Sequence, residues 1–534
     1  MLILYLRIGS KPLRPHPGYQ ALLRRVAADR RLSPQAKSAA QSIAEPKSAA
    51  TEKSLAVLPF DNLSDDKAND IFSDGISEVL INALGRVPGL TVKGRTSSFY
   101  FKQKKLSLPP REMAAQLGVA YLLHGGVRKT GNTVRITAQL SRAETDEVVW
   151  TSEPIKREVT DVFEVQDEIA ALVARKLSLA LAQPTTVSRN VSQEATLLYL
   201  QAMQLWRNRF GADYLERLAQ IESMMRRAVD IEPTFVDASV RLAEVLIFRE
   251  ASLSPMDQDG RLRSTLAEGL RWADRAVELD PNSAEAHALR AEAFAHAWQR
   301  READAAYQRA IGINPNFAVA RARYARFLEA DGRIDEALAE LEKSTQLDPL
   351  ASRALDNLAL MLIHAGRHTG AIAAAERSLA LAPDNYQALF YQAQALFRLG
   401  RKDAGMAVAS KLAKLEPEPF AKSDFAAYTC DLLVAQGRHD EAARFFEKIA
   451  PALVADRVFA AASLGRTSVV LELLNAHTLP SIWIDEVIWH PHFDPMRSAP
   501  GFVTWLKKTG LTESHARAQA WRAAHPSETP TPQK

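Results

Sequence analysis

Apolar residues change their spacing along the 534 residues of this chain, and the change separates regions of different architecture. Between residues 54 and 185, short apolar runs alternate with segments whose apolar residues recur every three or four positions. The runs predict strands and the other segments predict amphipathic helices. We expect strands at 54–60, 90–95 and 146–155, helices at 70–87, 109–118 and 161–181, and a β-hairpin at 119–140. This region is therefore predicted to be an α/β domain with a small mixed sheet.

Residues 194–475 have a helical pattern that repeats every 34 residues. Proline recurs at this step, at Pro281, Pro315, Pro349, Pro383 and Pro417, and glycine does so at Gly332, Gly366 and Gly400. Proline cannot continue a helix, and glycine permits a tight turn between two helices. A fixed period of this length is typical of a solenoid of helix pairs. We expect an all-α solenoid after the α/β domain.

Small residues in the same register make the solenoid resemble the tetratricopeptide repeat family. These residues are Ala291, Ala325, Ala359 and Ala393 in the first helix, and Ala303, Ala337, Ala371 and then Gly405 in the second. The tryptophan of the family is replaced by His287, Arg321, Leu355 and Leu389, so the proline, glycine and alanine positions define the repeats. The resemblance implies that the first helices line a concave groove that holds a peptide or helix of a partner protein.

The groove positions of the family can be carried over residue by residue. They fall on Glu285, Glu292, His296, Arg326, Arg353, Asp356, Gln387, Phe390, Gln394, Phe397 and Arg398. Aromatic and arginine side chains in the later repeats are the residue types that dominate binding hot spots. The family's chaperone-tail clamp needs Asn and Lys where this chain has Glu292, Arg326, Leu360 and Gln394, so a cochaperone role is not expected.

Five segments make the first domain resemble the TolB amino-terminal-like domain of bacterial regulatory proteins. They are residues 56–66, 72–84, 95–102, 117–140 and 162–170. In that family the domain commonly precedes tetratricopeptide repeats and often follows an adenylate cyclase or winged-helix domain. The resemblance implies a binding domain without catalytic residues.

Residues 1–53 and 476–534 flank the two predicted domains as an N-terminal helical segment with a linker, and as a C-terminal cap with a tail. Residues 12–25 align without gaps with residues 495–508, so we hypothesise that residues 11–26 form a second cap. The apolar run at the start stops at Arg7, too soon for a membrane span. We expect a cytoplasmic protein, or a periplasmic or membrane-anchored one if an upstream segment precedes this sequence.

Acidic side chains gather beside the first predicted strand, at Asp61, Asp65, Asp66, Asp70 and Asp74. Several carboxylates together can bind Mg²⁺. Ser64 or Asp65, and Ser73 or Asp74, are also the residue types that cap helices and form turns, and Gly75 fits a first helical turn. We favour the cap and turn interpretation.

Three other motifs each have a functional and a structural interpretation. Gly125 and Gly126 precede a strand pattern, which favours a bulge or a close strand approach over a phosphate loop. Residues 93–105 mix aromatic and basic residues, and we interpret them as a solvated loop and not as a nucleic-acid site. His490, His492 and Asp494 lie two apart as a possible metal trio, but a terminal cap is favoured.

Net charge is +4 with both signs mixed along the chain, which gives no electrostatic footprint for nucleic acid. The single cysteine excludes an intrachain disulfide. We interpret the chain as a non-enzymatic interaction or regulatory scaffold, with a protein partner and with no cofactor and no metal. The alternative is the detached regulatory half of an adenylate cyclase or transcription regulator. A metal-dependent enzyme is the third hypothesis and rests only on the acidic and histidine clusters.

Overall fold

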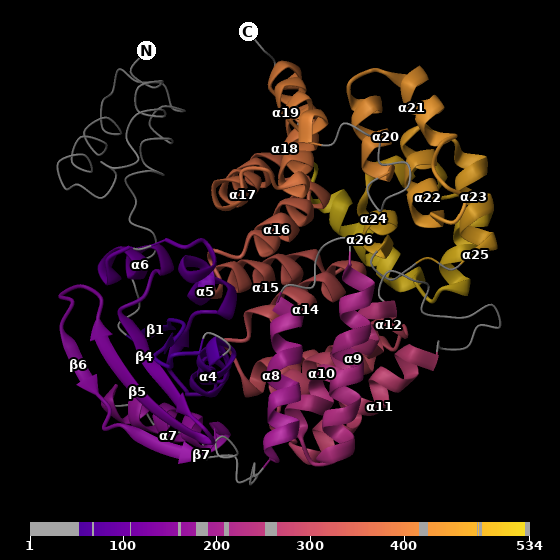
Figure 1. Cartoon of the computed structure of the whole chain (residues 1–534). Coiled ribbons are helices and arrows are strands. Elements are labelled where there is room, and N and C mark those ends of the chain that lie inside the picture. The colour runs from indigo at the N-terminus through magenta and orange to yellow at the C-terminus, as the bar shows by residue number, and fades with distance from the viewer. Residues whose placement is uncertain are drawn as a thin grey trace, which may run out of the picture.

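An α/β domain lies against the first half of a curved array of helices in the computed structural model (Figure 1). The structure describes residues 53–66, 69–106, 108–158, 162–177, 191–207, 213–250, 264–415, 426–477, 479 and 483–528. The hypothesised cap at residues 11–26 lies outside this part of the chain. No helix in the described ranges is long and apolar enough to cross a bilayer.

The sheet of the α/β domain has seven strands in the order β3-β1-β4-β5-β6, with β2 paired to β4 and β7 paired to β5. The first three strands pair in parallel with their neighbours, and the later ones pair antiparallel. Their bounds are Ser54–Val57 (β1), Asp61–Asn62 (β2), Thr91–Val92 (β3), Tyr121–Thr130 (β4), Thr133–Arg142 (β5), Val148–Thr151 (β6) and Ile155–Glu158 (β7). The predicted small mixed sheet and the hairpin are confirmed.

Both faces of β1 are buried, as its continuous apolar run predicts. Leu55 and Val57 pack in one core with α4 (Asp70–Gly85) and α7 (Val162–Lys176). Ala56 points to the other face, where it packs with α5 (Arg95–Gln103) and α6 (Pro110–Leu117). Alternate residues of a strand face opposite ways, so helices cover both sides of this strand.

The expectation of a solvated loop after β3 is wrong. Residues Arg95–Gln103 form α5, in which Phe99 and Phe101 are 2% and 4% exposed. The two aromatic side chains enter different cores, one on each side of the helix. The interleaved basic and aromatic residues are therefore the two sides of a packed helix.

The remaining helices form antiparallel pairs that stack along the chain. The first helices α12, α14, α16 and α18 begin at Ala284, Ala318, Ser352 and Tyr386, and the second helices α13, α15, α17 and α19 begin at Arg300, Ile334, His368 and Lys402. Both sets repeat every 34 residues, the period of the sequence. The pairs are α8 (Gln193–Arg207) with α9 (Tyr214–Ile231), α10 (Val236–Glu250) with α11 (Ser264–Leu279), α12 (Ala284–His296) with α13 (Arg300–Ile313), α14 (Ala318–Ala330) with α15 (Ile334–Leu347), α16 (Ser352–His364) with α17 (His368–Leu381), α18 (Tyr386–Arg398) with α19 (Lys402–Leu415), α20 (Ala426–Ala435) with α21 (His439–Phe446), and α22 (Val454–Ser463) with α23 (Thr467–Ala476).

The repeat signature residues have the predicted roles. Gly332, Gly366 and Gly400 have φ of +80°, +67° and +71° between the two helices of a pair, a conformation that side chains disfavour. The alanines of the signature are all fully buried where the helices cross: Ala291, Ala303, Ala325, Ala337, Ala359, Ala371 and Ala393. The predicted solenoid is therefore confirmed.

Two turns of the solenoid hold the α/β domain in place. The amide nitrogen of Asn316 donates to the carbonyls of Gly85 (2.9 Å) and Leu90 (2.8 Å), and its Oδ1 accepts from the amide of Val92 (3.2 Å). One repeat later, Asp348 accepts a hydrogen bond from the amide of Ser97 at 2.6 Å. Each turn contains the recurring proline, but Asn316 follows Pro315 whereas Asp348 precedes Pro349. Two different positions of successive repeats therefore contact α4, β3 and α5.

We expect Asn316→Ala to lower the free energy of unfolding by about 1 to 3 kcal/mol, because three hydrogen bonds between the domains are lost. Asp384→Ala is the matched control, since Asp384 holds the same position two repeats later and is exposed. Calorimetric unfolding of the two variants beside the wild type makes the comparison. Equal stability losses in both would contradict the assigned role of Asn316.

Candidate functional site: the inner face of the repeats

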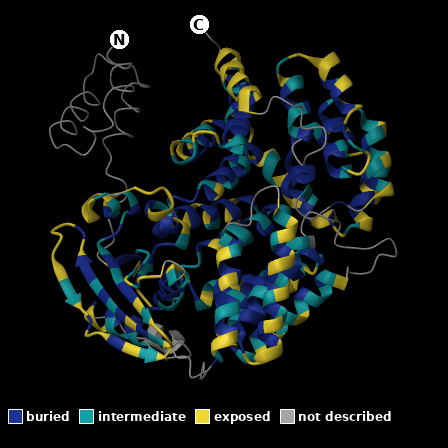
Figure 2. Cartoon of the chain, in the orientation of Figure 1, coloured by how far each residue is buried: buried dark blue, intermediate teal, exposed yellow. Residues whose placement is uncertain are grey.

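The C-terminal segment of the chain folds back against the repeats, and its first part, α24 and η4, covers the face formed by the first helices, which we call the inner face. The segment comprises α24 (Ile484–Trp489), the 3₁₀ helix η4 (Pro491–Met496), α25 (Pro500–Lys508) and α26 (Thr512–Ala524). In Figure 1 it is the yellow part of the chain, and Figure 2 shows that its contact with the repeats is largely buried. This arrangement decides which of the predicted groove residues are accessible.

Arg326, Gln394 and Arg398, all predicted groove residues, contact this segment. Arg326 lies 3.6 Å from the carboxylate of Asp485. Gln394 and Arg398 each place a side-chain nitrogen 3.3 Å from Nε2 of His490. These three residues therefore bind the chain itself.

A buried ionic cluster joins the segment to α14 again and to one more repeat, through His364 of α16. His364 contacts Glu329 through Nδ1 at 2.8 Å and Glu486 through Nε2 at 3.2 Å. Although burial alone would lower the pKa of His364, Glu486 and Glu329 raise it to about 10. Burial, with Glu329 and Glu486 adding to it, raises the pKa of Asp485 to about 7 despite the nearby Arg326. The cluster thus binds protons more tightly in the folded chain than when unfolded.

Large apolar side chains make the segment difficult to displace. Trp489, Phe493, Phe502 and Trp505 are at most 1% exposed. The indole of Trp489 also donates to the carbonyl of Glu329 at 2.8 Å. Of these four side chains, Trp489 and Phe493 meet the first helices, and exposing both costs about 3 to 6 kcal/mol at about 1.5 to 3 kcal/mol each. A partner that entered this half of the inner face would first have to offset that cost.

The α/β domain covers the start of the inner face. Glu285, another predicted groove residue, pairs with Arg86 of α4 at 3.5 Å. Glu292 accepts a hydrogen bond from the hydroxyl of Tyr307 at 2.5 Å, and His296 lies 3.5 Å from its carboxylate. Although burial raises the pKa of Glu292, its bond with His296 and the charge of Arg323 lower it to about 2. These residues are partners within the chain.

The last five predicted groove residues divide into buried and accessible ones. Asp356 is bound by Ser378 (2.6 Å) and Asn385 (2.8 Å), and Phe390 is 1% exposed. The ring of Phe397 packs against Gly405. A Cβ added to Gly405 would lie 2.9 Å from this ring. Arg353 is exposed and Gln387 is half-buried. Arg353 and Gln387, together with the half-buried Phe397, are therefore the predicted positions that combine surface access with a place outside the covered regions.

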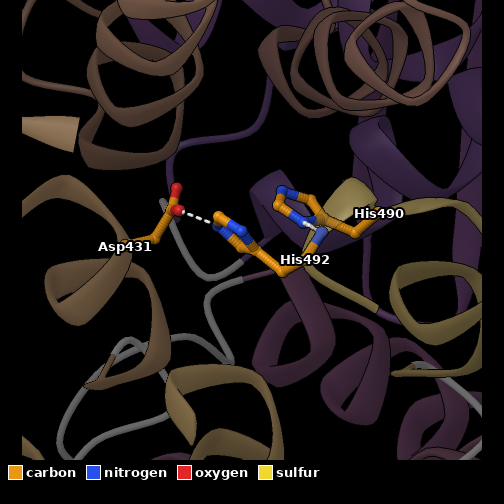
Figure 3. A group of neighbouring side chains, drawn as sticks. All are labelled: Asp431, His490 and His492. Atoms are coloured by element: carbon orange, nitrogen blue, oxygen red, sulfur yellow. Dashed lines mark hydrogen bonds and ion pairs between the residues drawn. The ribbon is translucent and has the colours of Figure 1, made fainter. Parts of the chain in front are cut away.

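His490 and His492 lie close to Asp431 of α20 in Figure 3, a group with metal-ligand chemistry. His492 Nε2 lies 2.5 Å from Asp431, and Nδ1 of His490 accepts the amide of His492 at 3.3 Å. A metal on Nε2 of a neutral His490 would require a proton on Nδ1, which that amide donor opposes. Arg398 beside Nε2 adds a positive charge. The geometry therefore fits a hydrogen-bond chain better than a cation site.

Asp494, the third member of the predicted histidine trio, lies outside this cluster. Its carboxylate binds Arg497 at 2.8 Å and Arg522 at 2.7 Å. It joins η4 to α26. The sequence did not single out Asp431, because it lies on a helix far from the histidines in the chain.

The acidic residues near the first strand contact different partners and do not share one. Asp70 accepts from Asn62 (2.8 Å), whereas Asp74 pairs with Lys102 (2.6 Å) and Arg207 (3.4 Å). The helix begins at Asp70 with no side-chain cap, so the prediction of Ser73 or Asp74 as its cap is wrong. Gly75 lies close to α8, where an added Cβ would lie 2.7 Å from the end of the Leu200 side chain.

The two central glycines of β4 have the predicted role. A Cβ on Gly125 would lie 2.1 Å from the carbonyl oxygen of Thr137 and 2.6 Å from the ring of Phe60. Gly126 pairs with Asp61 of β2. They are sites of close strand approach.

Gly332→Ala and Gly437→Ala form a matched pair, because both glycines have φ near +80° (+80° and +78°) between paired helices. A Cβ on Gly332 would lie 2.3 Å from the carbonyl oxygen of Ser514 in α26, whereas nothing lies within 4 Å of one on Gly437. We expect about 1 to 2 kcal/mol of destabilisation from Gly437→Ala and more from Gly332→Ala. Amide exchange in residues 512–524 should accelerate only in Gly332→Ala. Unchanged exchange there would contradict the described packing of α26.

The ionic cluster predicts a pH dependence of stability. The pKa of Asp485 is raised on folding, so its contribution is present below about pH 4 and is lost as pH rises to about 7. His364 contributes below about pH 6.5 and loses its contribution toward about pH 10. The free energy of unfolding of the wild type should fall between about pH 5 and 7. Asp485→Asn should make this fall smaller by on the order of 1 to 3 kcal/mol. Urea unfolding across this range tests it. Asp384→Asn is the exposed control, and a wild-type slope in Asp485→Asn would refute the assignment.

Sequence models of two families match parts of the chain. The second domain of HilA/YgeH-like transcriptional regulators matches residues 51–172. The tetratricopeptide repeat matches residues 314–386 and 371–419. The match confirms the predicted repeats, and it relates the first domain to the HilA/YgeH-like regulators. The resemblance to TolB stays a prediction.

A curated relative and several solved structures are similar to parts of the chain. The relative is named "Putative adenylate cyclase 3", from Rhizobium meliloti (strain 1021), and is 32% identical over 260 residues, which are 48% of this chain and 42% of the relative. The chain thus spans less than half of that relative. PilF of Pseudomonas aeruginosa has 23% identity and a TM-score of 0.32, covering 40% of this chain and 89% of its own. PilW, a type IV pilus biogenesis factor, has 19% identity and a TM-score of 0.34, covering 40% and 91%.

Proposed function

We propose that this chain is a non-enzymatic regulatory scaffold that binds a partner protein through the accessible edge of its inner face. The main support for this proposal is a column of side chains at equivalent positions of three successive repeats: Val319, Arg353 and Gln387. Val319 is 45% exposed, Arg353 is exposed and Gln387 is half-buried. Glu285 begins the same column and is already paired with Arg86.

The dimensions and chemistry of the column suit a short segment of a partner. First helices of neighbouring repeats lie about 10 Å apart, so three positions span about 20 Å, or about six residues of extended chain. An exposed valine, a guanidinium and an amide offer one apolar contact and hydrogen bonds to an acidic or polar peptide. The filled remainder of the inner face would act as a rigid support.

A photoreactive amino acid at Val319 tests the proposal in cells of the source organism. We expect it to cross-link a partner protein, and expect Arg353→Glu with Gln387→Glu to abolish the product. The control position is Glu336, whose side chain is 57% exposed on the second helix α15. Identical products from both positions, or a product insensitive to the double variant, would count against this surface.

The second candidate function is the regulatory half of an adenylate cyclase or transcription regulator whose output domain lies on another chain or another part of the protein. The HilA/YgeH-like match and the adenylate cyclase name of the relative favour it. Because the chain covers 42% of that relative, the remaining part can be expressed separately and combined with this chain. We expect cyclic AMP formation from the remaining part to change when this chain is added, and expect none from this chain alone. Turnover of ATP by the purified chain would contradict the non-enzymatic assignment.

A further inference from the structure

Three basic side chains form a row across the sheet of the α/β domain. Arg128 of β4 pairs directly with Arg135 of β5, and Arg135 pairs directly with Lys156 of β7. Directly paired residues of neighbouring strands point to the same face of a sheet, so the three side chains lie next to one another. Strands lie about 4.8 Å apart, which makes the row about 10 Å long. We call it the basic row.

The basic row lies on the face of the sheet opposite α4 and α7. Val134 and Ile136, the neighbours of Arg135 in the chain, are buried in the core formed with those helices, and alternate residues of a strand face opposite ways. The core on the other face, formed with α5 and α6, contains Leu122 of β4 but no residue of β5 or β7. All three residues of the row are accordingly exposed.

The positive charges of the row are not compensated by ion pairs. Like charges directly opposite each other destabilise a sheet, and Arg135 has one on both neighbouring strands. Nε of Arg128 donates to the carbonyl of Leu63 at 3.0 Å, which is a neutral acceptor, and the row has no ion pair within the described part of the chain. By contrast, Arg157 on the other face of β7 pairs with Glu168 at 2.9 Å. Such an arrangement is suited to an anionic partner.

Two carboxylates limit the extent of the basic surface. Glu158 lies two residues after Lys156 and therefore on the same face, and Asp61 of β2 pairs with Gly126, two residues before Arg128. A nucleic acid or an anionic membrane would extend past the row and meet these negative charges. The residues of β4, β5 and β7 on this face also include no Phe, Tyr or Trp on which bases could stack. A partner with a few acidic groups in a short line fits better.

We propose that the basic row binds an acidic helix of a partner protein, with three carboxylates on one side of that helix contacting Arg128, Arg135 and Lys156. Residues i, i+3 and i+7 share one side of a helix, and they lie about 4.5 and 10.5 Å along its axis from the first. Alternate residues of an extended chain lie about 6.6 Å apart, so three of them span about 13 Å. The helix matches the row of about 10 Å more closely, and guanidinium groups bind carboxylates through two parallel hydrogen bonds.

A labelled, alanine-rich helical peptide of about 20 residues with glutamate at i, i+3 and i+7 is the probe. We expect it to bind the full chain in fluorescence anisotropy with a dissociation constant of about 1 mM or tighter at low salt, and more weakly as salt is added. A peptide of the same composition with glutamate at i, i+5 and i+6, on different sides of the helix, should bind about threefold more weakly or worse. The inner-face column takes no part in this measurement, so it can fail while the proposed scaffold function holds.

Charge reversal at the centre of the row locates the site. Arg135→Glu should weaken binding of the acidic peptide about tenfold or more, and a peptide with lysine in place of its middle glutamate should regain affinity for this variant. Arg142→Glu is the matched control, because Arg142 is exposed on the same strand but on the opposite face, and it should leave binding unchanged. Arg135→Gln should bind the acidic peptide less well and yet unfold at a higher urea concentration, because two like-charge contacts are removed.

Three results would overturn the proposal. One is equal affinity of Arg135→Glu and Arg142→Glu for the acidic peptide. Another is equal affinity of the wild type for the two glutamate arrangements. The third is tighter binding of an oligothymidylate of similar length, or of phosphatidylserine vesicles, than of the peptide, because the row would then serve nucleic acid or a membrane.

Discussion

The docking of the α/β domain onto the proline-containing turns of the repeats is the interaction on which the rest of the structure depends. Asn316 supplies the hydrogen bond that the edge strand β3 lacks, and Asp348 binds the start of α5. Burial raises the pKa of Asp348 despite the hydrogen bonds from Ser97. Gly94 is needed beside it, because an added Cβ would lie 2.7 Å from this carboxylate. The position of α4 over the first repeats follows from these contacts.

Covering the inner face from both ends changes how such an array can work. Isolated helix pairs expose their first helices to a partner, as solenoids generally do. Here α4 covers the first part, and α24 and η4 cover the later part. What stays accessible is an edge of the face. Binding by the repeats is therefore expected at this edge and not in the centre of a groove.

Local sequence patterns predicted the helices and strands well, but they did not predict the long-range contacts. The 34-residue period specified the helix pairs and the left-handed glycines, since both depend on neighbouring residues. The helix α5 was missed because Phe99 and Phe101 alternate as in a strand or loop, and only two separate cores explain both. Gly75 was interpreted as part of a first helical turn, although it lies against Leu200 of α8, which is distant in the sequence. Nothing in residues 484–496 indicates by spacing that they return to Glu329 and His364, so the predicted groove residues could not be sorted into accessible and occupied ones.

Hydrogen–deuterium exchange tests the central claim, that the α/β domain, the repeats and the C-terminal segment form a single unit with a filled inner face. The diagnostic amides are those of Gly94, Ser97 and residues 488–490, which follow the first turn of α24. The account predicts that they exchange as slowly as the amides of α14 and α16, because all open only when the unit unfolds. Exchange of residues 488–490 within seconds, beside slow exchange in α14 and α16, would contradict it and leave the inner face open to a partner.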